Sequence, residues 1–272
     1  MFKNLPLGWK LGLGFGLVLL LTAVVAWVGQ NGMTTISGRA DKARRAAQIS
    51  LDLLEARRHE KNYIIRKDKM YIDNVHKAVS AMSSEATALR SLFKTPANQQ
   101  QMVNIQEALL TYEAAFKTYA SKDEDSARQA QIWRDLTKVI FDIGREVREN
   151  LVSPARTKAS SSRDLKSLLL WTEVSDSFNM DISRSFLMMR IAAIYYILKR
   201  TDEEWKLFED SVATMRAGMT KWAAYGDRLP ELRDVIQRMT QSLERYIQGG
   251  QVFHDNTMAQ IEAEKKMIES AR

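Results

Sequence analysis

The sequence predicts an all-α protein: an N-terminal transmembrane helix followed by two stacked four-helix bundles built from long antiparallel helices. Apolar residues recur at intervals of three and four over long stretches, which is the spacing of one helix face. The four prolines all lie outside these stretches, at Pro6, Pro96, Pro154 and Pro230. No glycine occurs between Gly38 and Gly144. Because Pro and Gly are the residues that most often interrupt helices, the long stretches are predicted to be helical.

Composition narrows the classes of function. The 272 residues suffice for one or two domains, and 45% hydrophobic with 27% charged residues is ordinary for a folded protein. The absence of cysteine from the sequence excludes disulfides, thiolate metal ligands and a thiol nucleophile. The formal net charge is +7, but basic and acidic residues alternate along the helices. A nucleic-acid surface needs a clustered basic patch, so we expect no nucleic acid partner.

The N-terminal region carries the expected membrane segment. Residues 1–10 are predicted to be a short cytoplasmic N-terminus and 11–29 a transmembrane helix. No charged residue occurs from Leu11 to Val28, and about 20 apolar residues suffice to cross a bilayer. A cleaved signal peptide is the alternative, but Ala26-Trp27-Val28 lacks the small residues of a cleavage site. We therefore favour an uncleaved anchor.

The charges that flank this segment define its orientation less clearly. Lys3 and Lys10 precede it and favour a cytoplasmic N-terminus, whereas other basic residues follow it, namely Arg39, Lys42, Arg44 and Arg45. Long domains cross the membrane largely regardless of such charges. We therefore place the rest of the chain outside the cytoplasm.

Long helical runs follow at 30–94, 99–150, 157–225 and from 231 onward. The turns between them are predicted at Thr95-Pro96-Ala97-Asn98, at Ser153-Pro154 and at 225–230, and 66–69 is a candidate break. At 1.5 Å per residue the first and third runs are about 100 Å long, twice the height of an ordinary bundle. The sequence therefore predicts two bundles, stacked end to end.

We expect these runs to form one bimodular domain over 30–272. The proximal module, next to the membrane, is predicted from about 30–67, 123–200 and 252–272. The distal module is predicted from about 69–122 and 203–250. The last run is too short to return to the membrane, so we expect the chain to be truncated before a second transmembrane helix.

Residues 55–62 interrupt the apolar pattern of the first run. Leu51, Leu54 and Ile64 are assigned to its buried face, yet this face has no large apolar residue from 55 to 62. Residues three and four apart share a face. At least one of Arg57, Arg58 and Lys61 is therefore expected to point inward.

A later segment repeats this one. Tyr196–Asp202 resembles Tyr63–Asp68 with one residue inserted, and Arg190 precedes it as Arg57 precedes the first copy. The offset is 133 residues, the separation of Tyr63 and Tyr196. The match is short, but it indicates an internal repeat.

The segments Arg57–Tyr63 and Arg190–Asp202 resemble the helical bimodular sensor domain of bacterial methyl-accepting chemotaxis receptors. The resemblance covers about 30–272 and implies a periplasmic ligand-binding domain, anchored in the inner membrane and acting as a homodimer. In family members that sense organic acids, arginines from several helices hold the carboxylates in the proximal module, and acetate can occupy the distal one. The second membrane span, the linker and the cytoplasmic signalling hairpin of such receptors are expected beyond residue 272.

The residues expected to bind the ligand are mostly arginines, because a guanidinium fits a carboxylate with two parallel hydrogen bonds. The resemblance carries over Arg57, Arg58, Arg184 and Arg190. Helix register adds Arg134 at about the height of Arg58, Lys61 belongs to the interrupted face, and Tyr196 is a candidate wall of the pocket. The alternative is that these cations are solvated and paired locally, as Glu55 with Arg58 or Asp181 with Arg184.

The predicted function is to bind a small organic acid, a di- or tricarboxylate, between bundle helices and to signal across the membrane by helix displacement. Several alternatives stay open. The same scaffold could sense a cationic amine or polyamine through Asp176, Asp181, Asp202 or Asp234. The chain could also be the input domain of a sensor histidine kinase, or a membrane-anchored helical protein that binds a partner and has no small-molecule site.

Catalytic and metal chemistry find no support in the sequence. His59, His76 and His254 are far apart, and no pair of them has the spacing of metal ligands. The sequence also lacks a nucleophile motif and a Gly-rich phosphate loop. We therefore expect no metal, no cofactor and no enzymatic activity.

Overall fold

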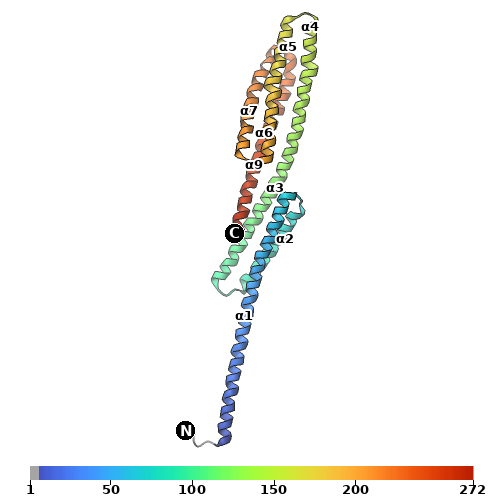
Figure 1. Cartoon of the computed structure of the whole chain (residues 1–272). Coiled ribbons are helices and arrows are strands. Elements are labelled where there is room, and N and C mark those ends of the chain that lie inside the picture. The colour runs from blue at the N-terminus through green and yellow to red at the C-terminus, as the bar shows by residue number, and fades with distance from the viewer. Residues whose placement is uncertain (1–5, 272) are drawn as a thin grey trace. The chain divides into compact units, whose positions relative to one another are not determined.

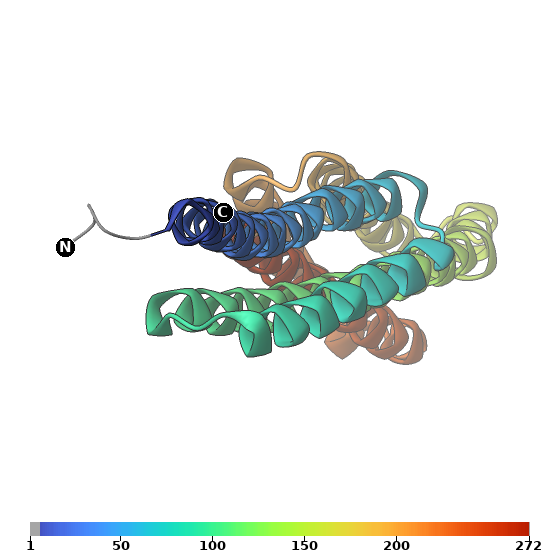
Figure 2. The same ribbon diagram turned by 90° about the horizontal axis from the view of Figure 1, so that it is seen from below.

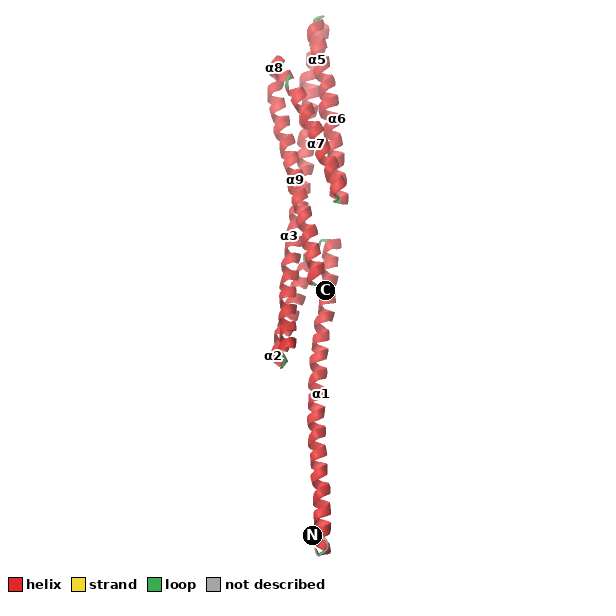
Figure 3. Cartoon of the chain, turned by 90° about the vertical axis from the view of Figure 1, so that its left-hand side faces the viewer, coloured by secondary structure: helices red, strands yellow, loops and turns green. Residues whose placement is uncertain are grey.

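A computed structural model describes residues 6–271 of the chain. Within this range the chain is almost entirely helical and contains no strand (Figure 3), which confirms the predicted all-α class. The elements, most of them labelled in Figure 1, are α1 Leu7–Arg66, α2 Met70–Leu92, α3 Pro96–Glu146, η1 Val147–Val152, α4 Ser153–Ser161, α5 Leu165–Ser177, η2 Phe178–Ser183, α6 Arg184–Lys199, α7 Asp202–Ala223, α8 Tyr225–Arg228, η3 Pro230–Leu232 and α9 Arg233–Ser270.

The first helix contains the expected membrane segment. α1 is one unbroken helix of 60 residues. It is the single helix within residues 6–271 that is long and apolar enough to cross a membrane, and none of its apolar window is buried against the protein. Apolar side chains without a protein partner are suited to lipid, where a helix satisfies its own backbone groups. The expected segment 11–29 lies inside this helix.

The helices form two compact units. Unit 1 comprises Met1–Phe116 with Lys266–Arg272, and unit 2 comprises Lys117–Lys265. This division differs from the expected modules, which grouped 69–122 with 203–250. In the structure most of the first of these segments belongs with α1, while 123–200 and 203–250 lie together in unit 2.

The difference arises at a tight turn after α1. Lys67 has a left-handed φ of 57°, and its N–H donates to the carbonyl of Tyr63, which ends the helix. α2 then runs back along α1 (Figure 2): the Nζ of Lys42 donates to the carbonyl of Leu92 at 2.6 Å. Arg45 also forms an ion pair with Glu85. The first run is therefore a hairpin of two helices, where the sequence led us to expect one long pass.

The core of unit 1 is built from one face of α2. Its buried residues follow one another at intervals of three and four: Tyr71, Val75, Val79, Met82, Ala86 and Leu89. Burying a side chain such as Val or Leu stabilises a fold by about 1.5–3 kcal/mol. The rings of Tyr63 and Phe116 meet edge-on, with centroids 5.7 Å apart, and join α1 to α3.

Unit 2 contains a second hairpin of the same kind, formed by α6 and α7. Arg200 has a left-handed φ of 56°, and its N–H donates to the carbonyl of Tyr196. The internal repeat aligns Arg200 with Lys67 and Tyr196 with Tyr63. Both copies of the repeat therefore end a helix with the same turn.

The predicted turn at Ser153-Pro154 is wrong. The helical path continues from α3 through the π-helical turn η1 into α4, and it reverses later, at Arg163, whose φ is 58°. Pro154 lies in the first turn of α4, directly after η1. Because Pro has no N–H, it cannot donate the backbone hydrogen bond to the preceding turn that an uninterrupted helix otherwise contains. The other predicted turns are confirmed, since the chain turns just before Pro96 and between α7 and α9.

A second π-helical turn, η2, packs closely against α7. A Cβ atom on Gly218 would lie 2.2 Å from the carbonyl oxygen of Asp181, which is closer than atoms can approach. Only glycine permits this contact. π-helical turns often occur near functional sites, and η1 and η2 both belong to unit 2.

Candidate ligand-binding sites

Residues 55–62 of α1, where the sequence predicts an inward-facing cation, place an acid, Glu60, in the core of unit 1. The buried residues of α1 are Ile49, Ala56, Glu60 and Tyr63, whereas Leu51 and Leu54 are exposed. The helix is therefore rotated relative to the expected register. Glu60 takes the inward place that was expected for a cation.

Glu60 is held by two partners inside unit 1. The Tyr112 hydroxyl donates to its Oε2 at 2.7 Å, and the Nζ of Lys61 lies 2.9 Å from its Oε1. A buried carboxylate requires such partners, because burial removes its hydration. Burial raises the pKa of Tyr112, and the negative charge of Glu60 and their hydrogen bond raise this pKa further. The core of unit 1 therefore already contains a carboxylate, which is paired with Lys61 and hydrogen-bonded by Tyr112.

The predicted cations of α1 lie around this buried acid. Arg58 is exposed and forms an ion pair with Glu55, which confirms the local pair proposed from the sequence. The side chain of Lys61 is 46% exposed although it contacts Glu60. Arg57 is half-buried, and its positive charge acts on the Tyr112 hydroxyl. Arg58 and Lys61 therefore remain accessible to a ligand from solvent.

His59 lies next to these cations. Its Nε2 is 3.3 Å from the Oε1 of Glu55, so the imidazole and Arg58 share one carboxylate. Its Nδ1 is buried and finds no hydrogen-bond partner among residues 6–271. His59 is not among the ligand residues that were predicted from the sequence, although it lies beside these cations.

The other predicted ligand residues lie in unit 2, and three of them have partners of their own. Arg134 is exposed and donates to the Oε1 of Gln131, and Arg184 is exposed. The guanidinium of Arg190 lies over the ring of Phe141, 5.6 Å from its centroid. Tyr196 is buried, with its hydroxyl 2.7 Å from the Nδ1 of His254. In this unit the structure does not gather the four side chains around one cavity.

The expected pair of Asp181 with Arg184 is replaced by another. Asp181 binds Lys221, with Nζ 2.8 Å from Oδ2, and accepts a hydrogen bond from Ser177. These contacts hold the pKa of Asp181 below its ordinary value. The π-helical turn η2 places Asp181 beside α7, and we found no residue pattern that predicts this turn.

A polar groove beside η1 has the chemistry of an anion site. It has a volume of about 570 Å³ and lies between η1, α4 and α5. Arg148 and Arg156 line it together with five hydroxyl groups and no acid; the hydroxyl residues are Ser153, Thr157, Ser160, Ser161 and Ser175. Guanidinium and hydroxyl donors suit a carboxylate. Neither arginine was predicted as a ligand residue, although Arg156 lies close to the Ser-rich stretch 159–162.

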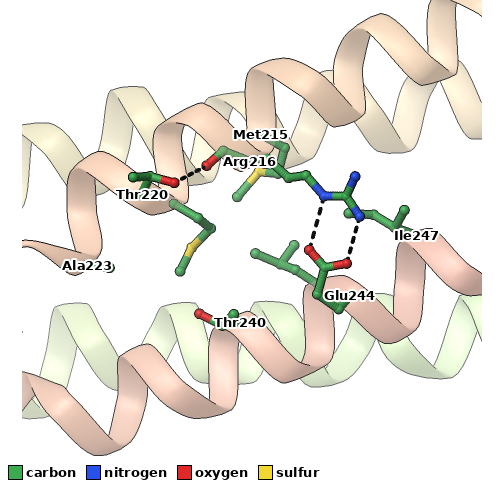
Figure 4. A pocket seen from close by; sticks show the side chains of 9 residues that line it. Met215, Arg216, Thr220, Ala223, Thr240, Glu244 and Ile247 are labelled. Atoms are coloured by element: carbon green, nitrogen blue, oxygen red, sulfur yellow. Dashed lines mark hydrogen bonds and ion pairs between the residues drawn. The ribbon is translucent and has the colours of Figure 1, made fainter.

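A second cavity, of about 310 Å³, lies between α7 and α9 (Figure 4). Its walls are largely apolar, with Met215, Met219 and Leu243 among them. Arg216 reaches across it to Glu244 with two hydrogen bonds, of 3.1 and 2.7 Å. The bond from Arg216 lowers the pKa of Glu244. Because this pair neutralises itself, the cavity offers no free charge to an ionic ligand.

Comparison with known proteins identifies a matching family and two similar proteins. The family profile described as "Helical bimodular sensor domain" matches residues 30–271. Among curated proteins, the chain is similar to the methyl-accepting chemotaxis protein McpQ of Pseudomonas putida, with 26% identity over 261 residues, 92% of this chain and 40% of McpQ. It is also similar to McpS of the same strain, with 27% identity over 163 residues, 60% of this chain and 25% of McpS.

The chain thus spans less than half the length of the curated relatives that it matches. The profile match nevertheless extends over nearly all of the sequence that follows the apolar segment. The match covers both compact units, including the repeated hairpins. This chain therefore belongs to the helical bimodular sensor domain family.

Proposed function

We propose that the chain is the ligand-sensing region of a transmembrane chemoreceptor, located in the periplasm and anchored in the inner membrane by α1. One observation carries this proposal: the sensor-domain match begins at residue 30, directly after the part of α1 that is apolar enough to span a bilayer. The two relatives are named as methyl-accepting chemotaxis proteins, and the matching profile describes a sensor domain, which favours a binding role over a catalytic one.

The proposed ligand is a small organic acid, a di- or tricarboxylate. In unit 1 the proposed contacts are Arg57, Arg58 and Lys61. The exposed pair of Arg58 with Glu55 contributes only about 0–1 kcal/mol, so a ligand carboxylate can displace Glu55 at little cost. The remaining proposed contacts are in unit 2, at Arg134, Arg184, Arg190 and Tyr196. Of these, Arg190 is half-buried and its ring contact orients the guanidinium.

The groove beside η1 supports the same ligand class in unit 2. Arg148 and Arg156 supply charge, and the surrounding hydroxyls supply further donors. An amine ligand has less support. Of its proposed partners, Asp181 is bound to Lys221 and Asp234 to Arg238, so each would have to give up an existing ion pair.

We infer that ligand binding displaces α1 and that the receptor acts as a homodimer. A ligand shifts an equilibrium only by its difference in affinity for two arrangements. Contacts with Arg57, Arg58 and Lys61 would bias the position of α1 directly, because all three belong to that helix.

A thermal-shift screen of the 272-residue chain in detergent micelles tests the ligand class. Di- and tricarboxylates should raise the unfolding midpoint, because a ligand that binds the folded state stabilises it. Arg58→Ala with Lys61→Ala should reduce the shift, and any shift that remains reports binding in unit 2. Arg128→Ala is a matched control, since Arg128 is also exposed and paired with an acid three residues earlier. A shift with amines alone would favour the amine sensor, and no shift at all would favour a partner-binding protein.

A further inference from the structure

The cavity between α7 and α9 combines a buried apolar floor with an exposed rim (Figure 4). Met215, Met219 and Leu243 form the floor, and each of them is at most 7% exposed. Thr220 on α7 and Thr240 on α9 belong to the rim, and both are exposed. Because the floor reaches into the core of unit 2 while the rim meets water, a small molecule can enter from solvent and bury most of its surface there.

The volume of this cavity, about 310 Å³, sets the size of the ligand. An apolar cavity of about 150 Å³ holds one benzene molecule, and ligand pockets in proteins begin at about 300 Å³. The cavity therefore has room for one substituted aromatic ring or two fused rings. A neighbouring cavity of about 240 Å³ lies along the same two helices and shares Arg216 and Ile247 with it, so Arg216 bounds the first cavity on that side.

The floor of the cavity favours an aromatic ring over a polar body. Water in a cavity needs about two to four polar partners, which methionine and leucine side chains do not supply. Methionine sulfur makes favourable contacts with aromatic rings, and the flexible side chain adapts to the ring that it meets. Met215 and Met219 lie one helical turn apart on α7, so both side chains can contact the same ring.

The ion pair at the edge of the cavity gives a charged ligand no advantage. Nε of Arg216 donates to one oxygen of Glu244, and Nη2 donates to the other. This two-pronged arrangement matches one cation with one acid. A charged ligand would only exchange one partner of the pair for another, whereas an uncharged ligand leaves the pair intact.

Two hydroxyl groups supply further polar chemistry. Oγ1 of Thr220 donates to the carbonyl of Arg216 at 3.1 Å, and Oγ1 of Thr240 donates to the carbonyl of Ile236 at 2.9 Å. Each hydroxyl thus uses its one proton within its own helix, while its oxygen keeps the capacity to accept a hydrogen bond. The complementary group on a ligand is a donor, such as the O–H of an alcohol or a phenol.

We propose that this cavity is a separate ligand site, which binds an uncharged aromatic molecule that carries a hydroxyl group. The ring packs against Met215 and Met219, and the hydroxyl donates to Thr220 or Thr240. The inference goes beyond the proposed function, because it concerns another cavity and another class of ligand than the carboxylates. It involves unit 2 alone, since every residue that lines the cavity belongs to Lys117–Lys265.

Methyl NMR of the full chain in detergent micelles, with isotope-labelled methionine, tests the site directly. Benzyl alcohol should shift the methyl signals of Met215 and Met219 saturably, because an aromatic ring changes the magnetic field at the groups that it contacts. Met215→Leu and Met219→Leu assign the two signals. Met82 and Met189 are also buried but do not line the cavity, so they are the controls. Equal shifts at all four methionines, or none at Met215 and Met219, would overturn the proposal.

A variant without the two hydroxyls tests the hydrogen bond. Thr220→Val with Thr240→Val keeps the shape of both side chains and removes their oxygens. It should weaken the binding of benzyl alcohol by about two- to tenfold, the contribution of one hydrogen bond. Toluene has the same ring without the hydroxyl, so its affinity should stay unchanged. Unchanged binding of benzyl alcohol, or equal weakening of both ligands, would overturn the proposal, and the Met82 and Met189 signals report whether the variant is folded.

Benzoate tests the absence of charge, because it has the same ring with a carboxylate. It should leave the Met215 and Met219 signals in place at concentrations where benzyl alcohol shifts them. Shifts as large as those of benzyl alcohol would overturn the proposal. None of these experiments contains a di- or tricarboxylate, so their failure leaves the thermal-shift test of the proposed function standing.

Discussion

The hydroxyl of Tyr112 on α3 donates to the carboxylate of Glu60 on α1 over 2.7 Å, inside the core of unit 1. Both residues are buried, so this hydrogen bond joins two helices where water cannot replace it. It also explains how an acid is tolerated on the inward face of α1. The stability of unit 1 should therefore depend on this one hydroxyl.

Tyr112→Phe should lower the free energy of unfolding by about 1–3 kcal/mol, the cost of leaving a buried acceptor with one partner fewer. Tyr71→Phe is the control, because the Tyr71 hydroxyl accepts a hydrogen bond from Arg66, which is exposed and can turn to water. Urea unfolding monitored by circular dichroism measures both. Equal losses in the two variants would contradict the special role of Glu60.

Two buried tryptophans should respond differently to the same substitution. The Nε1 of Trp133 donates to the carbonyl of Tyr246 at 2.6 Å, whereas the buried Nε1 of Trp222 finds no partner within residues 6–271. Trp133→Phe should therefore cost about 1–3 kcal/mol more than Trp222→Phe, since both remove the same volume but only one breaks a hydrogen bond. Unfolding free energies in urea give the difference. A larger loss at Trp222 would refute the assignment.

Two helical glycines form a second matched pair. Gly218→Ala should destabilise unit 2 by about 1–3 kcal/mol or more, because the new Cβ would collide with the backbone of η2. Gly144→Ala should stabilise it by about 0.5–1 kcal/mol, because the nearest atom to its Cβ is 3.5 Å away and alanine favours the helix. Thermal unfolding of the two variants should move the midpoint in opposite directions.

The Arg216–Glu244 pair should make a small, pH-dependent contribution. Arg216 lowers the pKa of Glu244 below 4.5, so the folded state holds the charged form more firmly than the unfolded state. The stabilisation is fully present above about pH 4.5 and is lost as the pH falls through the lowered pKa. Both side chains are about half exposed, so screening limits the effect to about 0–1 kcal/mol.

Glu244→Gln measures that contribution directly. The wild-type chain should be more stable than the variant at pH 7, and the difference should shrink as the pH falls below about 4.5. The unfolding midpoint at each pH provides the comparison. A difference that does not change with pH would mean that shape, and not charge, accounts for the role of Glu244.

The helical pattern and the apolar N-terminal segment were predictable because each depends on the spacing of residues along a single helix. The candidate break at 66–69 is confirmed, but the reversal of the chain there was not predictable, because Arg66-Lys67-Asp68-Lys69 contains neither Gly nor Pro and a charged residue supplies the left-handed φ. The aligned turn at Arg200 uses the same device. The identity of the two turns becomes apparent only when their backbone geometry is known.

The candidate site was partly predictable. The pair of Arg58 with Glu55 followed from their spacing on one helix, and the structure confirms it. The inward orientation of the Glu60 side chain depends on Tyr112, which lies 52 residues away, so no local pattern could predict it. The groove of Arg148 and Arg156 similarly lies beside a π-helical turn, which local residue patterns do not predict.

The unbroken course of α1 has a mechanical consequence. The helix contains both the proposed ligand contacts at Arg57, Arg58 and Lys61 and the part that is apolar enough to cross a membrane. Backbone hydrogen bonds link every turn to the next, so the helix resists compression along its axis. Bending would need a hinge, and the nearest one, at Lys67, lies past the ligand contacts. α1 is therefore suited to carry a displacement along its own axis as a rigid rod, and not to bend between the ligand contacts and the membrane.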